Sequence, residues 1–355
     1  MIATDITATW IDQILHASGH LAHATVVDAR PRPLGTGQMS DSFRVELSYD
    51  VDDAGPATLI AKLPAADETS RTTAKLLRSY EKEVRFYQEL APDLEVRVPQ
   101  AFHAEIDVET AGFVLLLEDL HPAVQGDQLA GCSPAVAASA LHQLVALHAP
   151  RWGDARLADI EWLAGDEEAG RAIGRGLLPM LWAGFLDRYG DVLEASVVDA
   201  GSWLFTHLDV HLEPGSSPLT LVHGDYRLDN LLIIDGPEPE VVGIVDWQTC
   251  ARGPAMRDVA YVIGAGLLPE IRRANEEALV RRHHGELLDA GVPDFSWEQC
   301  WDDYRRGTWA GLVMAVGASM LVERTDRGDE MFLAMASRHA QHAHDLEATE
   351  LGTPS

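Results

Sequence analysis

Cysteine and long apolar runs are both scarce in this chain of 355 residues. The three cysteines, Cys132, Cys250 and Cys300, lie far apart, and none belongs to a CxxC pair. Their spacing argues against a disulfide framework or a zinc knuckle and favours reduced thiols in a core. The longest apolar stretch, residues 312–322, is half of the ~20 residues that a membrane helix needs. We therefore expect no membrane span.

The N-terminus also lacks the features of an exported protein. A signal peptide has a basic start followed by an apolar run. Residues 1–10 instead contain Asp5 and polar threonines. The sequence therefore predicts a cytoplasmic protein.

Positive charge is in deficit along the whole chain. Lysine and arginine number 27 against 56 aspartates and glutamates, which gives a formal net charge of −29. Such a chain repels phosphate backbones, so neither nucleic acid nor an anionic membrane is the expected main partner. A neutral or cationic small substrate fits better. The hydrophobic fraction of 46% is ordinary for a globular protein, and the length suits two packed lobes.

Hydrophobic periodicity divides the chain into an N-terminal part, residues 1–117, and a C-terminal part, residues 118–355. In the first part it predicts helices and an antiparallel meander of strands that is followed by two further strands. The expected helices are 9–23 and 69–90, and the expected strands are 26–34, 42–49, 57–63, 100–107 and 112–118. This order of elements predicts a small α+β lobe.

The C-terminal part is expected to be larger and mainly helical. One β-like region, residues 219–245, interrupts it, with apolar runs at 231–234 and 241–245. The expected helices are 134–149, 169–189, 202–212, 269–289, 297–324 and 329–347. The chain as a whole is therefore predicted to have an α+β class with two lobes.

The most informative segment is a loop that begins at His223 and carries Asp225 and Asn230, followed by a hairpin and then Asp246. This order can bring oxygen ligands to one point. Mg²⁺ prefers carboxylate and carbonyl oxygens and keeps waters and substrate phosphates as its other ligands. We therefore predict that Asn230 and Asp246 are metal ligands. Asp225 is then the carboxylate that orients a substrate hydroxyl or accepts its proton during in-line phosphoryl transfer.

This spacing resembles the catalytic loop and metal-binding motif of protein kinases and their small-molecule relatives. More specifically, residues 223–230 and 246–248 resemble the aminoglycoside phosphotransferase and choline-kinase-like superfamily. The residue Gln248 and the amino-acid sequence of the expected helix at residues 81–87 favour a resemblance to its ecdysteroid-kinase-like branch. The resemblance covers nearly the whole chain and implies a bilobal protein-kinase-like fold with ATP between the lobes.

The resemblance implies roles for several residues of the N-terminal lobe. Lys62 looks like the lysine that holds the α- and β-phosphates. Glu83 looks like the glutamate that pairs with that lysine, and Glu81 is the competing choice. Since residues two apart on a helix face different sides, only one of them can point inward, and the apolar face favours Glu83. Gly35 and Gly37 resemble the loop that covers the phosphates.

Further roles are implied near the junction of the lobes and in the catalytic loop. Backbone groups at Glu118 and Leu120 are expected to meet the adenine edge. Arg227 lies two residues after Asp225, where many protein kinases place a lysine. We predict that Arg227 stabilises charge on the transferred phosphate. The acid of the later motif, Asp258, is expected to brace the loop.

Taken together, the residues predict an enzyme that moves the γ-phosphate of ATP, with Mg²⁺, to a hydroxyl of a small molecule. No lengthy activation segment lies between Asp246 and Asp258, which disfavours a protein substrate. The acceptor stays open between a cation, such as an aminoglycoside or choline-like compound, and an apolar alcohol, such as a steroid-like or hydroxyacyl compound. The choice of ATP over GTP and the oligomeric state also stay open. The alternative is a nucleotide-binding pseudokinase, against which the intact catalytic set argues.

Overall fold

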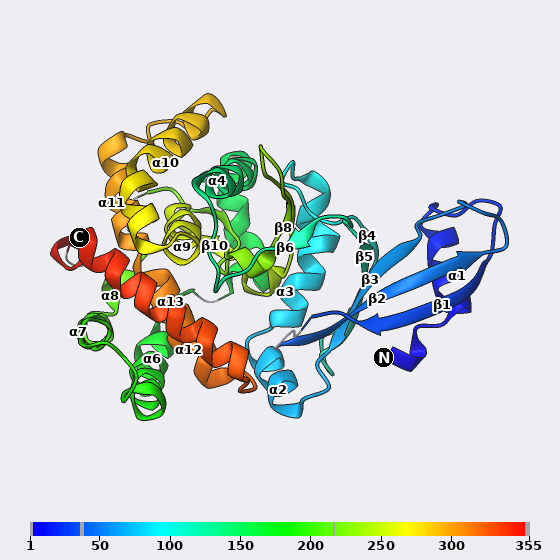
Figure 1. Cartoon of the computed structure of the whole chain (residues 1–355), viewed down its shortest axis with the longest axis horizontal. Coiled ribbons are helices and arrows are strands. Elements are labelled where there is room, and N and C mark those ends of the chain that lie inside the picture. The colour runs from blue at the N-terminus through cyan, green and yellow to red at the C-terminus, as the bar shows by residue number, and fades with distance from the viewer. Residues whose placement is uncertain (1–2, 36–38, 166, 216, 352–355) are drawn as a thin grey trace. The chain divides into compact units, whose positions relative to one another are not determined.

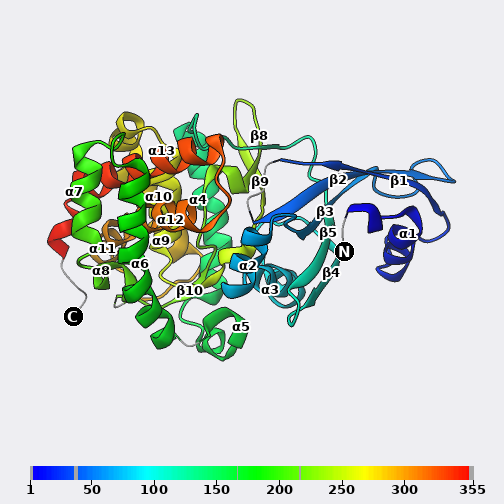
Figure 2. The same ribbon diagram turned by 90° about the horizontal axis from the view of Figure 1, so that it is seen from below.

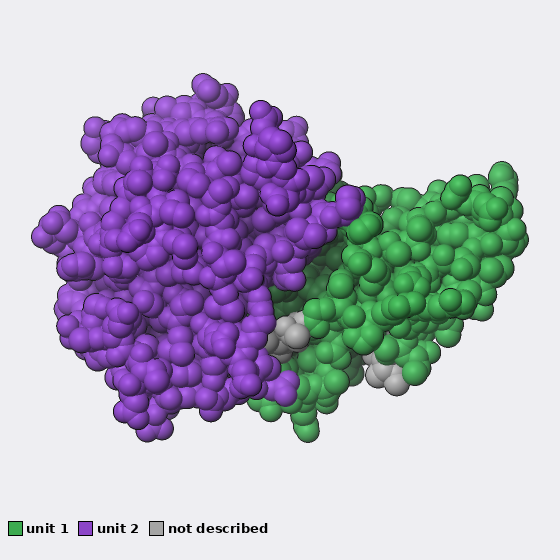
Figure 3. Space-filling view, viewed as in Figure 1, with its two compact units in different colours: residues 1–93, 98–121, 246–248 green, residues 94–97, 122–245, 249–355 purple. Residues whose placement is uncertain are grey.

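The computed structural model describes residues 3–35, 39–165, 167–215 and 217–351. The chain forms two compact units, which Figure 3 colours separately. Unit 1 comprises residues 1–93, 98–121 and 246–248, and unit 2 comprises residues 94–97, 122–245 and 249–355. The boundary predicted between residues 117 and 118 stays a prediction. In the part of the chain that is described, no helix has the length and apolar character needed to cross a membrane.

Unit 1 is built on one antiparallel sheet of five strands in the order β1-β2-β3-β5-β4 (Figures 1 and 2). Its elements are α1 (Ala8–Ala17), β1 (Val26–Pro33), β2 (Ser40–Tyr49), β3 (Thr58–Pro64), α2 (Glu68–Leu76), α3 (Ser79–Arg85), β4 (Ala101–Asp107) and β5 (Gly112–Glu118). The first three strands form the predicted meander. Helix α3 continues into a π-helical turn at Phe86–Leu90.

The two faces of this sheet are buried against different helices. Side chains alternate along a strand, so neighbouring residues face opposite sides. On β5, Val114 and Leu116 join the core that includes Ile11 and Leu15 of α1. The other face of β5 carries Phe113, whose ring contacts Tyr80 of α3 at 4.5 Å. On β3, Leu59, Ala61 and Leu63 belong to the α1 core, so Lys62 faces the α3 side.

The helix predicted over residues 69–90 is wrong in one respect, because the structure divides it. Helix α2 ends at Leu76, and α3 begins at Ser79 after Arg78, whose φ of 56° is left-handed. A non-glycine residue in this region interrupts the α-helix. Leu76 and Leu77, two apolar residues beside the break, are 81% and 46% exposed. The break allows α3 to turn a different face inward.

Unit 2 combines helices with two small antiparallel sheets, β10-β7 and β6-β8-β9. Its strands are β6 (Val124–Gln125), β7 (Thr220–Val222), β8 (Leu231–Ile234), β9 (Glu240–Ile244) and β10 (Ala251–Gly253). Its helices are α4 (Pro134–His148), α5 (Glu161–Ala164), α6 (Glu167–Tyr189), α7 (Ala195–Leu204), α8 (Asp209–Leu212), α9 (Met256–Gly266), α10 (Pro269–Asp289), α11 (Trp297–Gly307), α12 (Trp309–Leu321) and α13 (Asp326–Asp345).

Helix α9 lies at the centre of unit 2, because every residue from Asp258 to Gly266 is buried. It packs against α4, α10, α11, α12 and α13, which surround it in both ribbon views (Figures 1 and 2). The predicted α+β class, with its antiparallel sheet and its mainly helical second part, is confirmed.

Two predicted helices of unit 2 are each divided in the structure. The helix expected over 297–324 is α11 and α12, separated at Thr308, whose hydroxyl donates to the carbonyl of Arg305 at 2.7 Å. Such local bonds compete with the regular helix. The helix expected over 202–212 is instead the end of α7 followed by the short α8.

Candidate active site

The first candidate group of residues lies in unit 1 around Lys62 of β3. The Lys62 Nζ donates to Glu83 Oε1 at 2.5 Å and to Asp246 Oδ1 at 3.1 Å. The Glu83 side chain is fully buried, and that of Lys62 is 10% exposed. Burial by itself lowers the pKa of Lys62, but attraction by Asp246 and Glu83 outweighs burial and raises it. Lys62 is therefore held as a buried cation.

The structure brings Lys62 together with Glu83 and not with Glu81. Helix α3 turns Glu83 toward the sheet, whereas Glu81 Oε2 accepts from Arg78 Nε at 2.9 Å. Residues two apart on a helix cannot share a partner on one side. Arg78 is thus both the break between the helices and the partner of the competing glutamate.

Asp246 occupies an unusual backbone conformation in the same unit. Its φ is 69°, a left-handed value that costs a non-glycine residue on the order of 1–3 kcal/mol. The next two residues anchor the segment. Trp247 stacks on Phe86 with ring centroids 3.8 Å apart, and Gln248 Nε2 donates to Ser40 Oγ at 3.3 Å. These contacts hold the Asp246 carboxylate near Lys62.

The second candidate group lies in unit 2, in the loop that follows β7. Asp225 Oδ1 accepts from the Tyr261 hydroxyl at 2.6 Å. Its Oδ2 accepts from Arg227 Nε at 3.1 Å and from Asn230 Nδ2 at 3.0 Å. Asn230 Nδ2 also donates to the Asp225 backbone carbonyl at 2.8 Å. Both carboxylate oxygens are therefore fixed in direction by neighbouring donors.

Asp258 of α9 holds the start of this loop. Its carboxylate accepts from the backbone N–H of His223 at 2.7 Å and of Gly224 at 3.0 Å, and lies 3.3 Å from His148 Nε2. Burial raises the pKa of Asp258, but the bonds from His148 and from the loop outweigh burial and leave the pKa below its usual value. Gly224 has a φ of 83°, and a Cβ there would lie 2.5 Å from the Thr249 carbonyl oxygen. The loop therefore requires glycine at this point.

Arg227 lies between two carboxylates of the loop. Besides Asp225, its Nη1 donates to Asp229 Oδ2 at 2.8 Å. Its side chain is 15% exposed, and its Nη1 also lies 3.0 Å from the sulfur of Met331. In this position Arg227 orients Asp225. Its contact with a transferred phosphate stays a prediction.

The remaining predicted nucleotide-binding residues belong to unit 1. Gly35 follows β1 with a φ of 70°, and Gly37 lies outside the described residues. Glu118 ends β5, where its N–H donates to the Gln100 carbonyl at 2.8 Å, and Leu120 follows two residues later. Because the Glu118 N–H is engaged, the groups expected for an adenine edge are the Glu118 carbonyl and the Leu120 N–H. Their contact with adenine stays a prediction.

The chemistry of Asn230 and Asp246 fits Mg²⁺. The Asn230 amide nitrogen is bound to Asp225, so its side-chain oxygen is the atom left for a cation, and Asp246 supplies a carboxylate. The described residues contain no group of three or more His, Cys, Asp or Glu side chains arranged for a metal. Mg²⁺ that is held by two protein oxygens, phosphates and water does not need such a group.

Sequence reasoning missed the role of Tyr261, which the structure places against Asp225. A signal was present, because Tyr261 lies three residues after Asp258 on α9. Residues three apart on a helix share a side. Because Asp258 contacts the loop, Tyr261, one turn later on the same side of α9, can also reach it.

Both groups of residues fall within a stretch that matches a known family. A family model described as "Phosphotransferase enzyme family" matches residues 32–296. The chain belongs to this phosphotransferase family. The superfamily expected from the motifs is thereby confirmed, and the leaning toward the ecdysteroid-kinase-like branch stays a prediction.

Solved structures of other phosphotransferases share the fold of this family member. The choline kinase of Cryptosporidium parvum Iowa II is 12% identical, with a TM-score of 0.58 over 97% of this chain and 96% of that chain. The GDP complex of wild-type aminoglycoside 2'-phosphotransferase-IIIa is 16% identical, with a TM-score of 0.52 over 94% of this chain and 99% of that chain. At such identities the likeness establishes the protein-kinase-like fold.

A sequence relative with another name matches over a short stretch. "Acyl-CoA dehydrogenase family member 10" of Mus musculus is 42% identical over 76 residues. The match covers 21% of this chain and only 7% of the mouse protein. The matched stretch is thus a small part of both proteins.

Proposed function

We propose that this family member transfers the γ-phosphate of ATP to a hydroxyl group of a small molecule in a reaction that requires Mg²⁺. A small-molecule phosphotransferase is what the family and the fold support. The observation that carries the proposal is the environment of Asp225. Its carboxylate is held by Tyr261, Arg227 and Asn230, as a residue that must meet a substrate hydroxyl in one direction would be.

The residues of unit 1 are proposed to bind the nucleotide. Lys62, fixed by Glu83, holds the α- and β-phosphates, and the loop with Gly35 and Gly37 covers them. The Glu118 carbonyl and the Leu120 N–H bind the adenine edge. Because Lys62 is already charged and immobile, binding phosphate requires little reorganisation of the protein.

Asn230 and Asp246 are proposed to hold Mg²⁺ through their side-chain oxygens. When bound, the ion neutralises charge on the phosphate oxygens. Asp246 follows Val245 directly, and the Val245 N–H donates to the Asn230 carbonyl at 3.0 Å. The two proposed ligands therefore belong to connected stretches of chain.

Asp225 is proposed to receive the acceptor hydroxyl. As the new bond from this oxygen to the γ-phosphorus forms, the bond to the β-phosphate oxygen breaks, ADP leaves, and the hydroxyl proton passes to an oxygen of Asp225. Tyr261 and Asn230 keep the carboxylate in line. Arg227 keeps its orientation and is proposed to stabilise the negative charge of the moving phosphoryl group.

The decisive experiment is Mg²⁺-dependent ATP consumption with a mixed panel of aminoglycosides, amino alcohols, sterols, hydroxy acids and hydroxyacyl thioesters. We expect one class to stimulate consumption. Asp225→Asn should lower the stimulated rate by about a thousandfold while nucleotide binding is kept. The matched control is Asp235→Asn, which makes the same change at an exposed hairpin residue of unit 2 and should leave the rate unchanged.

Two results would decide against the proposal. If nucleotide binds with Mg²⁺ but no acceptor stimulates turnover, the protein acts as a nucleotide-binding module. Equal rates in native protein and Asp225→Asn would likewise remove Asp225 from the chemistry.

A further inference from the structure

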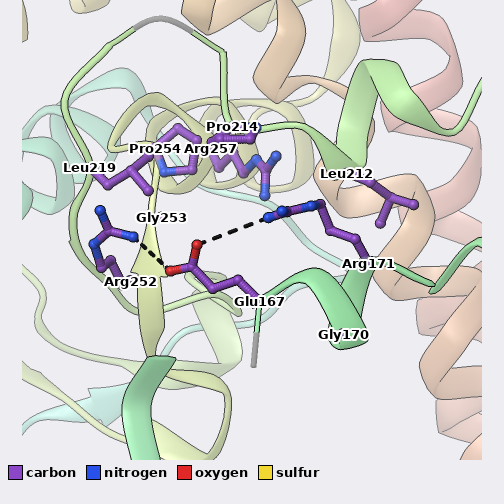
Figure 4. A pocket seen from close by; sticks show the side chains of 10 residues that line it. All are labelled: Glu167, Gly170, Arg171, Leu212, Pro214, Leu219, Arg252, Gly253, Pro254 and Arg257. Atoms are coloured by element: carbon purple, nitrogen blue, oxygen red, sulfur yellow. Dashed lines mark hydrogen bonds and ion pairs between the residues drawn. The ribbon is translucent and has the colours of Figure 1, made fainter. Parts of the chain in front are cut away.

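Unit 2 contains a pocket of about 220 Å³ whose lining is rich in arginine (Figure 4). Among the residues that the structure describes, three arginines, Arg171, Arg252 and Arg257, line it with one carboxylate, that of Glu167. The chain as a whole has 56 acidic residues against 27 basic ones. The pocket therefore reverses the charge balance of the molecule.

The single carboxylate does not satisfy the arginines that surround it. Glu167 lies between Arg252 and Arg171 in Figure 4. Its Oε1 accepts from Arg252 Nη1 at 2.6 Å, but its Oε2 is 3.9 Å from Arg171 Nη1. The other acid near Arg171 is Glu213, at 3.8 Å, and Glu213 is bound more closely by Arg175 at 2.6 Å. Within the described part of the chain, the ion pairs of Arg171 are therefore distant ones.

Of the other two guanidinium groups, Arg257 is held by backbone carbonyls, whereas Arg252 keeps one donor without an acceptor among the residues described. Arg257 Nη2 donates to the backbone carbonyls of His211 and Glu213. Burial lowers the pKa of Arg257 to about 10, although Asp258 and Asp303 oppose the change. Arg252 Nε is buried without a hydrogen-bond partner among the residues described. A buried donor without an acceptor is costly.

The pocket is built on β10 and on the start of β7, the strand that the Asp225 loop follows. Leu219 lines the pocket and directly precedes β7. Arg252 of β10 pairs with Leu221 of β7. Asp225 lies six positions after Leu219, and a chain cannot extend by more than about 3.5 Å per residue. The backbone path from Leu219 to Asp225, which includes the extended strand β7, spans at most about 21 Å, so an acceptor that meets both the pocket and Asp225 must be long.

We propose that the phosphate acceptor carries an anionic group, a carboxylate or a phosphate, which binds in this pocket to Arg171 and Arg252 while its hydroxyl lies at Asp225. This inference rests on the proposed phosphotransfer and narrows its acceptor to a hydroxylated acid. Guanidinium groups bind such anions in a bidentate manner. The volume of about 220 Å³ suits one anionic group and its nearest atoms, not a whole ligand. The Glu167 carboxylate contacts the same two arginines and would compete with the anion for them.

The test compares acceptors with and without an anionic group. ω-Hydroxydodecanoate, whose chain is long enough to reach from the pocket toward Asp225, is paired with ω-hydroxydodecanamide, and ω-hydroxydodecyl phosphate with dodecanediol, so that the two arms separate a carboxylate from a phosphate. We expect kcat/KM for the preferred acid to exceed that of its neutral partner by at least about tenfold. Arg252→Gln should raise the acceptor KM for the acid by about ten- to hundredfold and leave the ATP KM unchanged.

Two further variants separate anion binding from a structural role. Arg156→Gln is the matched control, because Arg156 also pairs with a carboxylate, Asp154 at 2.8 Å, but lies outside the pocket. It should change nothing. Glu167→Gln should act in the opposite direction to Arg252→Gln and lower the acceptor KM several-fold, because it removes the competing anion. If the pair of Arg252 and Glu167 has a purely structural role, both variants should instead raise the acceptor KM.

The outcomes distinguish this inference from the proposed function. If neutral or cationic alcohols are phosphorylated as fast as the acids, the phosphotransfer stands and the pocket assignment is overturned. If no acceptor is phosphorylated, calorimetric binding of the two anionic probes to native protein and Arg252→Gln decides the pocket separately. Equal binding by the two proteins, or none, overturns it.

Discussion

The two candidate groups differ in the sign of the charge that they enclose. In unit 1 a cation, Lys62, is held by the carboxylates of Glu83 and Asp246. In unit 2 an anion, Asp225, is held by the donors of Tyr261 and Asn230 and by Arg227. The proposed roles, binding of phosphate by Lys62 and receipt of a proton by Asp225, fit these opposite surroundings.

The two groups also differ in the charges of the partner side chains that remain when the central residue is replaced. The partners of Lys62 are both acids, and one of them, Glu83, is completely buried. Two of the three partners of Asp225 are neutral. A defect in the unit 1 group should therefore reduce the stability of the fold, whereas removal of one donor in the unit 2 group should mainly reduce turnover.

The largest effect is expected from Lys62→Met. The variant leaves Glu83 buried without its cation, and breaking a buried pair from one side costs about 3–5 kcal/mol. Denaturant unfolding should show a loss of this size. The same change at Lys75, whose Nζ donates to a backbone carbonyl at an exposed site, serves as the control and should cost far less.

The double variant Lys62→Met/Glu83→Gln sharpens this test. It removes the orphaned charge together with the cation, so part of the lost stability should return while activity stays low. A double variant as unstable as Lys62→Met alone would show that the loss has another cause.

Much of the fold follows from local patterns in the sequence. The strand predicted over residues 112–118 coincides with β5, and the apolar run 231–234 coincides with β8, because each is a short apolar segment bounded by turn residues. The helix predicted over 69–90 failed at Arg78, whose left-handed φ has no marker in the apolar spacing. Thr308 divides α11 from α12 for a similarly local reason.

Part of the candidate site could also be predicted from the sequence. Lys62, Asp225 and Asn230 stand out because their residue types and order match a known chemistry. The contact of Tyr261 with Asp225, and the stacking of Trp247 on Phe86, join residues distant in the chain. Such contacts depend on packing between elements, which no local pattern specifies.

The burial of histidine side chains is a second difference between the two units. Unit 2 buries His283 and His339, at 1% and 0% exposure, whereas every described histidine of unit 1 is at least partly exposed. Burial lowers the pKa of both to about 3. The unfolded chain, with a histidine pKa of about 6.5, therefore binds more protons than the folded chain between about pH 3 and pH 6.5.

Stability of unit 2 should accordingly be full above about pH 6.5 and fall as the pH drops, by about 2 kcal/mol per buried histidine at about pH 5. Hydrogen exchange at about pH 7.5 and pH 5, corrected for intrinsic rates, resolves the two units. His283→Gln should flatten the pH dependence of unit 2, and His103→Gln, at a partly exposed site of unit 1, should not. An equal loss in both units would contradict the assignment.

The smallest effect is expected from Tyr261→Phe, which removes one donor from Asp225 and keeps the ring. Loss of this 2.6 Å bond frees one carboxylate oxygen to turn, so kcat should fall by about tenfold, equivalent to about 1.4 kcal/mol. The KM for ATP should stay unchanged, because Lys62 and its partners are untouched. Steady-state kinetics with varied ATP and varied acceptor separate these constants.

Tyr304→Phe supplies the matched control for this last comparison. Tyr304 is equally buried in unit 2, and its hydroxyl also donates to a carboxylate, Glu276 Oε2 at 3.1 Å. Its loss should reduce the stability of unit 2 to an extent similar to Tyr261→Phe, because the same kind of bond is broken, but kcat should not change. If both variants lower kcat equally, the Tyr261 hydroxyl supports only the helices of unit 2, and the idea that neutral donors set the direction of Asp225 fails.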